Sequence, residues 1–426
     1  MAMRAKINLA ALLILLLAAP AQAANHMDHY FGSGGIKGMA YQPTPTDYFV
    51  PAPVKYGNTD FYNSDFQALW GTDAKGVTRT VHVGGEIKHQ GDLQTLHDMG
   101  VNLVRLYSWQ GMAGWVDHSP FLDECDRLGI KVIVPIFVTG DSSTTSQFYK
   151  NIESIINETS GHSSVAFYSI GNEISPSAEP DVFQTIKVYA DRARALLDQK
   201  GAKQMIISPT WGSVEARGWF TSHKVAIDAW AFNVYDPDTI NGLARVIKNK
   251  TLDDKPVFFS EYGVDAFNNA TSLQDETMQA KAAAELITPI YANLDKFWGG
   301  TWFEFSDERW KGLDKSEAGG QADRTATAST YLNQAGGSYH TSVGGSVLTI
   351  PAQYVGNCTY GWKVGWTPDQ VMNEGYFGMG YLNYSGKEAQ TVKNGESRNY
   401  QNYPWIYRVD DLYLRAVHET LKTQFR

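Results

Sequence analysis

The sequence predicts an α/β protein folded as a (β/α)8 TIM barrel with a long insertion after its eighth strand. Eight short apolar runs alternate with segments of helical period, and hydrophobic residues make up 43% of the 426 residues against 19% charged. Runs that are apolar throughout are typical of strands buried on both faces. Eight repeats of strand and crossover are the barrel pattern.

The eight expected strands are, in chain order, Ile36–Tyr41, Leu103–Tyr107, Val132–Phe137, Val165–Ile170, Met205–Ser208, Ala229–Val234, Val257–Ser260 and Gly300–Phe305. Amphipathic helices are expected between them, most clearly over Asp181–Gln199 and Leu273–Leu294, where apolar residues recur along one stripe. In such a barrel the loops that follow the strands form the catalytic face.

The N-terminus has the pattern of a secretory signal peptide. Arg4 and Lys6 precede an apolar run from Leu9 to Leu17, and small residues follow at 21–23. The run is too short to span a hydrocarbon core of ~30 Å. We therefore expect a cleaved signal over 1–23, a linker over 24–34, and a secreted or periplasmic protein with no membrane insertion after cleavage.

The remaining chain, 35–426, is expected to form a single catalytic barrel domain with two long loops. The first runs from Gln42 to Glu86 after strand one. The second, 306–404, is interpreted as an expanded loop, or lid, after strand eight. A closing helix is expected over 405–426, where Leu412, Tyr413 and Leu421 share a helical face. A separate binding domain is the alternative, and the closing helix argues against it.

Composition excludes some function classes. The net charge is −9, or −11 without Arg4 and Lys6, and no basic run is present to neutralise phosphates, so nucleic-acid binding is disfavoured. No Cys/His spacing resembles a zinc site, so no metal or cofactor is implied. Cys125 and Cys358 either form a disulfide, or Cys125 is a buried free thiol, and both alternatives remain open. The oligomeric state also remains open. Aromatic residues reach 13%, which favours a site that stacks sugar rings.

Two carboxylates stand out by their context. Glu173 follows an apolar strand that ends in Gly171 and Asn172, and Glu261 follows Phe258–Ser260. They would sit at the ends of strands four and seven and point into the same mouth. Retaining glycoside hydrolysis needs such a pair about 5–5.5 Å apart, one acting as general acid and the other as nucleophile.

Three further residues can prepare this pair. Asn172 can bind a sugar hydroxyl next to the reacting carbon. Arg105, inside strand two, must be paired if it is buried, and Glu261 is the obvious partner. Tyr235, at the end of strand six, can donate to Glu261.

Four strand-end residues are candidates for sugar contact. Tyr41 and Tyr107 either bind sugar or pack. Trp302 is either a stacking platform or core. Glu304 either binds a sugar hydroxyl or pairs with Arg309.

The order of Arg105 in strand two, Asn172-Glu173 after strand four and Glu261 after strand seven resembles clan A of the glycoside hydrolases. Within the clan, the segments 36–42, 102–108, 171–173, 258–263 and 299–305 resemble family 72, the β-1,3-glucanosyltransferases. The resemblance covers roughly residues 35 to 310. It implies a retaining mechanism with Glu173 as acid/base and Glu261 as nucleophile. The long segment after strand eight has no counterpart in family 72, and 307–311 and 373–378 look more like bacterial β-galactosidase-like members of the clan.

The sequence therefore favours a retaining β-glycosidase or transglycosylase acting on a polysaccharide or oligosaccharide, most simply β-1,3-glucan. Two alternatives stay open. One is another clan A β-glycoside hydrolase, for example a β-galactosidase-like enzyme. The other is a catalytically silent polysaccharide-binding barrel, which needs aromatic platforms but not the carboxylate pair.

Overall fold

The structure is a computed structural model. It describes residues 27–41, 79–107, 109, 118–136, 138, 145–178, 180–212, 214–268, 270–271, 273–307, 339–343, 346–350, 362–363, 366–373, 376–383 and 411–426. The expected signal peptide and Cys358 lie outside these ranges. Cys125 is a buried free thiol. Within the described chain, no helix combines the length and apolar character needed to cross a membrane.

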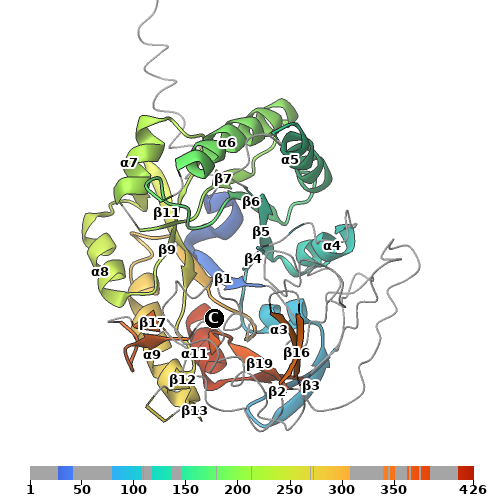
Figure 1. The fold of residues 1–426 in the computed structure, drawn as a ribbon, viewed down its shortest axis with the longest axis vertical. Helices are drawn as coiled ribbons and strands as arrows, with labels where there is room; N and C mark the ends of the chain where they lie inside the picture. The colour runs from blue at the N-terminus through green and yellow to red at the C-terminus, as the bar shows by residue number, and fades with distance from the viewer. Residues whose placement is uncertain are drawn as a thin grey trace, which may run out of the picture.

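The centre of the molecule is the predicted parallel barrel (Figure 1). Its strands are β1 (Ile36–Ala40), β4 (Leu103–Arg105), β5 (Lys131–Ile136), β6 (Val165–Ile170), β7 (Met205–Ile207), β8 (Thr210–Trp211), β9 (Trp230–Asn233), β11 (Lys255–Tyr262) and β14 (Gly299–Trp302). The hydrogen-bonded path starts at β7 and ends at β8. Only Ser208 and Pro209 separate these two strands, so they form one interrupted fifth strand that closes the circle.

Helices surround the barrel, as the sequence predicts (Figure 1). They are α3 (Asp92–Asp98), α4 (Ser119–Leu128), α5 (Thr145–Thr159), α6 (Pro180–Lys200), α7 (Val214–Ser222), α8 (Pro237–Val246), α9 (Glu276–Tyr291) and α11 (Ala416–Phe425). The expected helix over 181–199 is confirmed as α6. The helix expected over 273–294 begins later, because Leu273–Gln274 form the short strand β13, which pairs with β12 (Phe267–Asn268). Asp275 then caps α9 by accepting a hydrogen bond from the Met278 amide at 2.9 Å.

The barrel interior is filled with apolar side chains at its N-terminal end. Met27 and Phe31 belong to this cluster, and the Phe31 ring stacks on Phe167 with centroids 6.0 Å apart. Residues 27–31 are helical and are followed by η1 (Gly32–Gly34), so this part of the stretch expected as a linker packs against the barrel. The opposite end of the barrel is left for polar chemistry.

A second sheet stands beside the barrel and corrects two expectations. Its order is β19 (Gly380–Asn383), β20 (Asp411–Leu414), β2 (Arg79–Val83) and β3 (Glu86–Gln90). The expected loop over 42–86 therefore contains strand β2 and ends in β3. Of the expected closing helix over 405–426, the structure describes residues 411–426, and these are helical over 416–425 because 411–414 form a strand.

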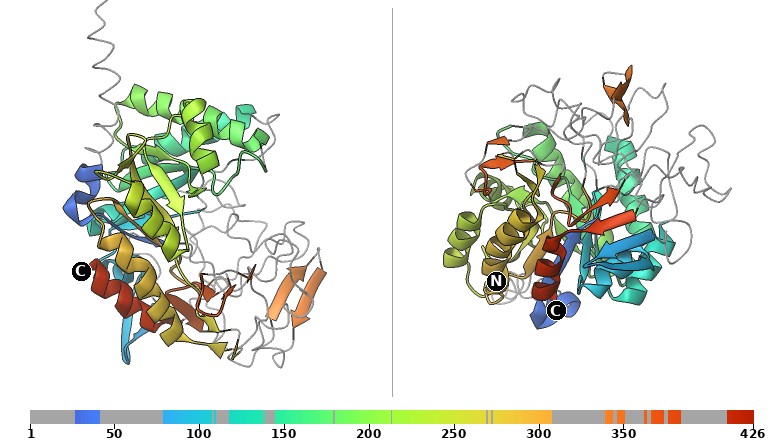
Figure 2. Two further views of the ribbon diagram at one scale, coloured as in Figure 1. Left: turned by 90° about the vertical axis from the view of Figure 1, so that its left-hand side faces the viewer. Right: turned by 90° about the horizontal axis from the view of Figure 1, so that it is seen from below.

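The described parts of the segment after β14 contact the barrel end. Met379 donates its amide to the Glu304 carbonyl at 2.7 Å, and Asp307 donates to the Gly380 carbonyl at 3.0 Å. Further short pairs are β10 (Thr251–Leu252) on β11, β15 (Tyr339–Val343) with β16 (Ser346–Ile350), and β17 (Trp362–Lys363) with β18 (Val371–Met372). Helix α11, in red, lies along α9, in gold, in both views of Figure 2. The chain end thus completes the barrel wall next to β14.

Candidate active site

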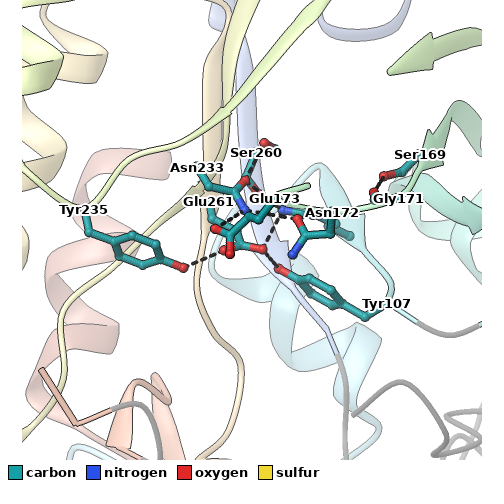
Figure 3. A network of polar contacts seen from close by, with 10 residues as sticks. Tyr107, Ser169, Gly171, Asn172, Glu173, Asn233, Tyr235, Ser260 and Glu261 are labelled. Carbon is teal, nitrogen blue, oxygen red and sulfur yellow. Dashed lines mark hydrogen bonds and ion pairs between the residues drawn. The ribbon is translucent and has the colours of Figure 1, made fainter. Parts of the chain in front are cut away.

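Glu261 accepts three side-chain hydrogen bonds at the C-terminal end of the barrel (Figure 3). Strand β11 runs through it to Tyr262, with a shift in its pairing with β9 between Phe259 and Glu261, and only 4% of the residue is exposed. Its Oε1 accepts hydrogen bonds from Arg105 Nη1 at 2.7 Å and Tyr107 OH at 2.5 Å. Its Oε2 accepts one from Tyr235 OH at 2.5 Å. Three donors therefore hold this carboxylate in one orientation.

Glu173 follows β6 in an unusual backbone conformation. Gly171 and Glu173 have φ angles of 66° and 55°, in the left-handed region that a glutamate rarely adopts. The Glu173 amide donates to the Pro209 carbonyl at 2.9 Å, which holds the turn against the interrupted fifth strand. Non-glycine residues in this region cost of order 1–3 kcal/mol and cluster at functional sites. This backbone conformation directs the Glu173 side chain toward the barrel mouth, where its Oε1 accepts a hydrogen bond from Asn233 Nδ2 at 2.8 Å.

Asn233 links the two carboxylates. Besides its bond to Glu173, its Oδ1 accepts from Ser260 Oγ at 2.7 Å and from Arg105 Nη1 at 3.2 Å. Arg105 Nη1 in turn donates to Glu261. Glu173 and Glu261 therefore belong to one continuous network through a buried amide and a buried guanidinium (Figure 3).

The same guanidinium also fixes Asn172. Arg105 Nη2 donates to Asn172 Oδ1 at 2.7 Å, and Asn233 Nδ2 lies 3.1 Å from that oxygen. With its oxygen occupied in this way, Asn172 has its amide NH2 group to offer to a substrate hydroxyl. A cavity of about 100 Å³ lies beside it, lined also by Ile136, Val138 and Ile174.

The three side-chain donors around Glu261 keep their protons. Burial raises the pKa values of Tyr107 and Tyr235 well above the ordinary value of a tyrosine, and the charge of Glu261 raises both pKa values further. Burial alone would lower the pKa of Arg105, but the neighbouring Tyr107, Glu261 and Glu173 raise it on balance. Both phenols therefore stay protonated and the guanidinium stays charged across the physiological range.

The structure brings five predicted residues into contact around Glu261, namely Arg105, Tyr107, Asn172, Glu173 and Tyr235. It does not bring Tyr41 there. Tyr41 is fully buried, its hydroxyl donates to Asp92 Oδ2 at 3.0 Å, and Asp92 is paired with Arg79. Of its two interpretations, this burial favours packing over sugar contact.

Trp302 and Glu304 have different positions. Trp302 is fully buried, with its ring edge-on to Tyr262 at 5.8 Å, which favours the core interpretation over the stacking platform. Glu304 is 1% exposed and raises the pKa of Tyr107, which places its charge near the site. Its alternative partner Arg309 lies outside the described residues.

An aromatic wall stands beside Glu261. It is a cluster of buried residues with Trp366 packed against it: Ala40, Tyr107, Tyr235, Phe303, Met372 and Phe377. The Trp366 ring stacks on Tyr235 with centroids 5.8 Å apart. Phe303 lies close to the backbone of Gly263, and a Cβ atom at Gly263 would collide with the Phe303 carbonyl. The insertion thus supplies part of the wall of the site.

Two functional residues were not anticipated from the sequence, Asn233 and Ser260. The available signal was their polar character at the end of otherwise apolar strands, Asn233 two residues before Tyr235 and Ser260 directly before Glu261. Side chains two apart on a strand share a face. That parity places Asn233 on the face of Tyr235.

One group in the described chain has the composition of a metal site, at the other end of the barrel. Asp123 and Asp126 of α4 face His162, whose Nδ1 lies 3.7 and 3.3 Å from them. Ser163 Oγ also donates to Asp126. His162 precedes β6 whereas Glu173 follows it, so this group has no part in the site above.

Comparisons with known proteins return structures only. No family model and no curated protein matches the chain. A Bacteroides uniformis β-glucuronidase 2 is 18% identical over 51% of this chain and 28% of its own, with a TM-score of 0.40. A glycosyl hydrolase family 2 member from Bacteroides cellulosilyticus is 15% identical over 62% of this chain and 36% of its own, with a TM-score of 0.38.

A third structure, XacCel5A in complex with cellopentaose, is 15% identical over 50% of this chain and 79% of its own, with a TM-score of 0.36. This chain spans about three tenths of the length of the Bacteroides uniformis β-glucuronidases. The likeness is distant and partial, so the hydrogen-bonded carboxylates of the site, rather than these relatives, are the basis for the function below.

Proposed function

We propose that this protein is a retaining β-glycoside hydrolase or transglycosylase that works by double displacement. One observation supports this most: Glu261 is held by donors on both oxygens and shares a network with Glu173, which comes from a strand across the barrel mouth. Glu173 also has a left-handed backbone, and non-glycine residues in that conformation cluster at functional sites.

In the first step, a Glu261 oxygen attacks the anomeric carbon while the bond from that carbon to the leaving oxygen breaks. The leaving oxygen takes the proton of the Glu173 carboxylic acid. The result is a glycosyl ester on Glu261 and a carboxylate at Glu173. Because the carbon inverts once here and once in the second step, the product keeps the β configuration.

In the second step, Glu173 acts as a base. It removes a proton from water or from a sugar hydroxyl, whose oxygen attacks the anomeric carbon and releases Glu261 as a carboxylate. Water gives hydrolysis and a sugar gives transfer. The two reactions share every step up to the ester, so the residues above support both.

Arg105 and the two tyrosines have a defined task in this scheme. The charge on Glu261 disappears when the ester forms and returns when it breaks. The buried Arg105 lowers the energy of the returning carboxylate, and Tyr107 and Tyr235 do the same through short hydrogen bonds. Asn233 positions Glu173 by donating a hydrogen bond to its Oε1.

For the substrate we propose a β-linked glucan, with β-1,3-glucan first. This part of the proposal rests on the resemblance of the strand-end motifs to glycoside hydrolase family 72 and on the aromatic wall beside Tyr235. The signal-like N-terminus supports action outside the cytoplasm, secreted or periplasmic.

The test is a panel of β-glycans with product anomers followed by NMR, using the wild type, Glu261→Ala and Glu285→Ala. Glu285 is an exposed glutamate of α9 and serves as the matched control. Glu261→Ala should lose turnover, and azide should restore it by giving the product of opposite anomeric configuration, because azide fills the space of the nucleophile. Glu285→Ala should behave as wild type.

Three results would contradict the proposal. Rescue with retained configuration would mean that Glu261 is not the nucleophile. Turnover of another β-glycoside without action on β-1,3-glucan would replace the substrate and leave the mechanism intact. Binding without turnover across the panel would favour a silent polysaccharide-binding barrel.

A further inference from the structure

Trp211 is an exposed aromatic residue at the rim of the barrel. It is the last residue of β8, and 48% of it is exposed, while the preceding Thr210 is buried. Single exposed apolar residues are normal on a protein surface, and Ile87, Val214, Val246 and Leu273 are even more exposed. Its exposure therefore carries little weight, and its position relative to the carboxylates carries the argument.

The strand register gives the direction of the Trp211 side chain. Trp211 pairs with Asn233 in the parallel ladder between β8 and β9, and residues in register on neighbouring strands point to the same face. Asn233 points into the mouth, where it binds Glu173. Trp211 therefore faces the mouth too, and its ring lies 6.2 Å from that of Tyr235.

The backbone ties Trp211 to the proposed acid/base. The Glu173 amide donates to the Pro209 carbonyl, two residues before Trp211 on the same interrupted strand. The acid of a double displacement touches the oxygen that leaves in the first step and attacks in the second. A side chain on the rim next to Glu173 therefore borders the place of the leaving or incoming sugar.

We infer that Trp211 is the stacking platform for the sugar in this leaving-group and acceptor subsite, an inference that rests on the proposed function. The flat indole offers a large apolar face to the C–H face of a pyranose, and its exposure means that the face is available. By binding the acceptor, Trp211 sets how often a sugar rather than water resolves the ester.

Transfer and hydrolysis diverge only at the ester, so their ratio reports acceptor binding and is independent of the first step. In transfer, the acceptor hydroxyl oxygen bonds to the anomeric carbon, the bond to Glu261 breaks, and the hydroxyl proton goes to Glu173. A merely structural role for Trp211 would lower both products together. An acceptor platform changes the ratio.

The experiment compares wild type, Trp211→Ala, Trp211→Phe and Val214→Ala on β-1,3-linked glucohexaose. Val214 is 77% exposed at the start of α7 and is the matched control. The ratio of products longer than the donor to shorter ones should fall about tenfold in Trp211→Ala, the loss of about 1.4 kcal/mol of acceptor binding. It should fall less in Trp211→Phe, which keeps a flat ring, and should not change in Val214→Ala.

A binding measurement covers the case in which transfer is absent. In the Glu261→Ala background, calorimetry with the same hexasaccharide should show about tenfold weaker binding when Trp211 is also replaced by alanine. An unchanged ratio of products in Trp211→Ala overturns the inference. Where the wild type makes no products longer than the donor, unchanged binding overturns it. In both cases, turnover by the wild type leaves the proposed function standing. If the hexasaccharide is neither cleaved nor bound, the platform inference is overturned with the β-1,3-glucan assignment.

Discussion

Removal of the Tyr235 hydroxyl is the most selective perturbation of the site. Among the described residues, Tyr235 is the hydrogen-bond donor to Glu261 Oε2, at 2.5 Å. The ring of a Tyr235→Phe variant would keep its contacts with Trp366 and Phe377, whose centroids lie 5.8 and 5.6 Å away. The variant therefore subtracts one charge-assisted hydrogen bond and leaves the aromatic wall in place.

The size and the position of the effect follow from that geometry. A hydrogen bond to a charged group contributes about 1.5–3 kcal/mol, which corresponds to roughly 10–150-fold in rate. The donor stabilises Glu261 when its charge returns, that is, in the second step. In the first step the charge is lost, so the missing donor costs little. We expect kcat to fall by about 10–100-fold and the glycosyl-enzyme to become the dominant species during turnover.

Tyr107→Phe is the matched variant. The oxygen that Tyr107 binds, Oε1, also accepts from Arg105 at 2.7 Å, so it keeps a charged donor when the phenol is removed. Its loss should therefore cost less than that of Tyr235. Intact-protein mass spectrometry of acid-quenched reactions should show the ester in Tyr235→Phe and far less of it in Tyr107→Phe. An equal or larger effect of Tyr107→Phe, or a Tyr235→Phe variant without accumulated ester, would refute this reasoning.

Three other variants test the surrounding structure. Arg105→Ala should lower the free energy of unfolding by about 3–5 kcal/mol in chemical denaturation, because it leaves the buried Glu261 without its cation. In a Glu261→Gln background, the same substitution should cost less, which would show that the two residues are coupled. An equal loss in both backgrounds would exclude the coupling. Asn233→Ala should lower kcat about 10–100-fold with little change in KM, because Glu173 loses its amide donor; wild-type kinetics would contradict this. Burial raises the pKa of Asp265 to about 8 from 3.8, so its contribution to stability is full below pH 3.8 and is lost as the pH rises to 8, a loss of up to about 6 kcal/mol. Asp265→Asn should remove that dependence in calorimetric melting curves, and a variant with the wild-type slope would argue against it.

The barrel and its carboxylate pair were predictable because their signals are local. Continuous apolar runs mark strands buried on both faces, and a polar residue at the end of such a run must lie at the barrel mouth. Arg105 illustrates this: a charge inside an apolar strand needs a buried partner, and Glu261 is that partner in the structure. Both inferences needed only strand order and parity.

Other features depend on contacts that parity and period do not encode. Tyr41 lies just after β1, where a single step of alternation decides whether a side chain faces the mouth or the helices. It faces Asp92 of α3, and Arg79 of β2 completes that buried group. The pairing of Asp92 with a strand inside an expected loop has no signature near Tyr41 in the chain.

The chain end shows the same limit for secondary structure. Leu412 and Tyr413 continue the apolar period of α11 backwards, which predicts helix. They form β20 instead, because Leu412 pairs with Val81 on one side and Leu382 on the other. A short apolar run takes the structure of its neighbours, and these neighbours lie far away in sequence.

That second sheet also determines how the site is held together. Arg415, between β20 and α11, binds both oxygens of Asp307 at 2.6 Å, and neither side chain is exposed. Arg415 also donates to the Gly378 carbonyl, next to Phe377 of the aromatic wall. Asp307 follows closely on Phe303 of the same wall. Separating the partners of a buried ion pair is strongly destabilising. Because this pair joins the closing helix to the wall beside Tyr235, the two should unfold together. Residues 411–426 are therefore part of the structure that supports the candidate site beside Tyr235.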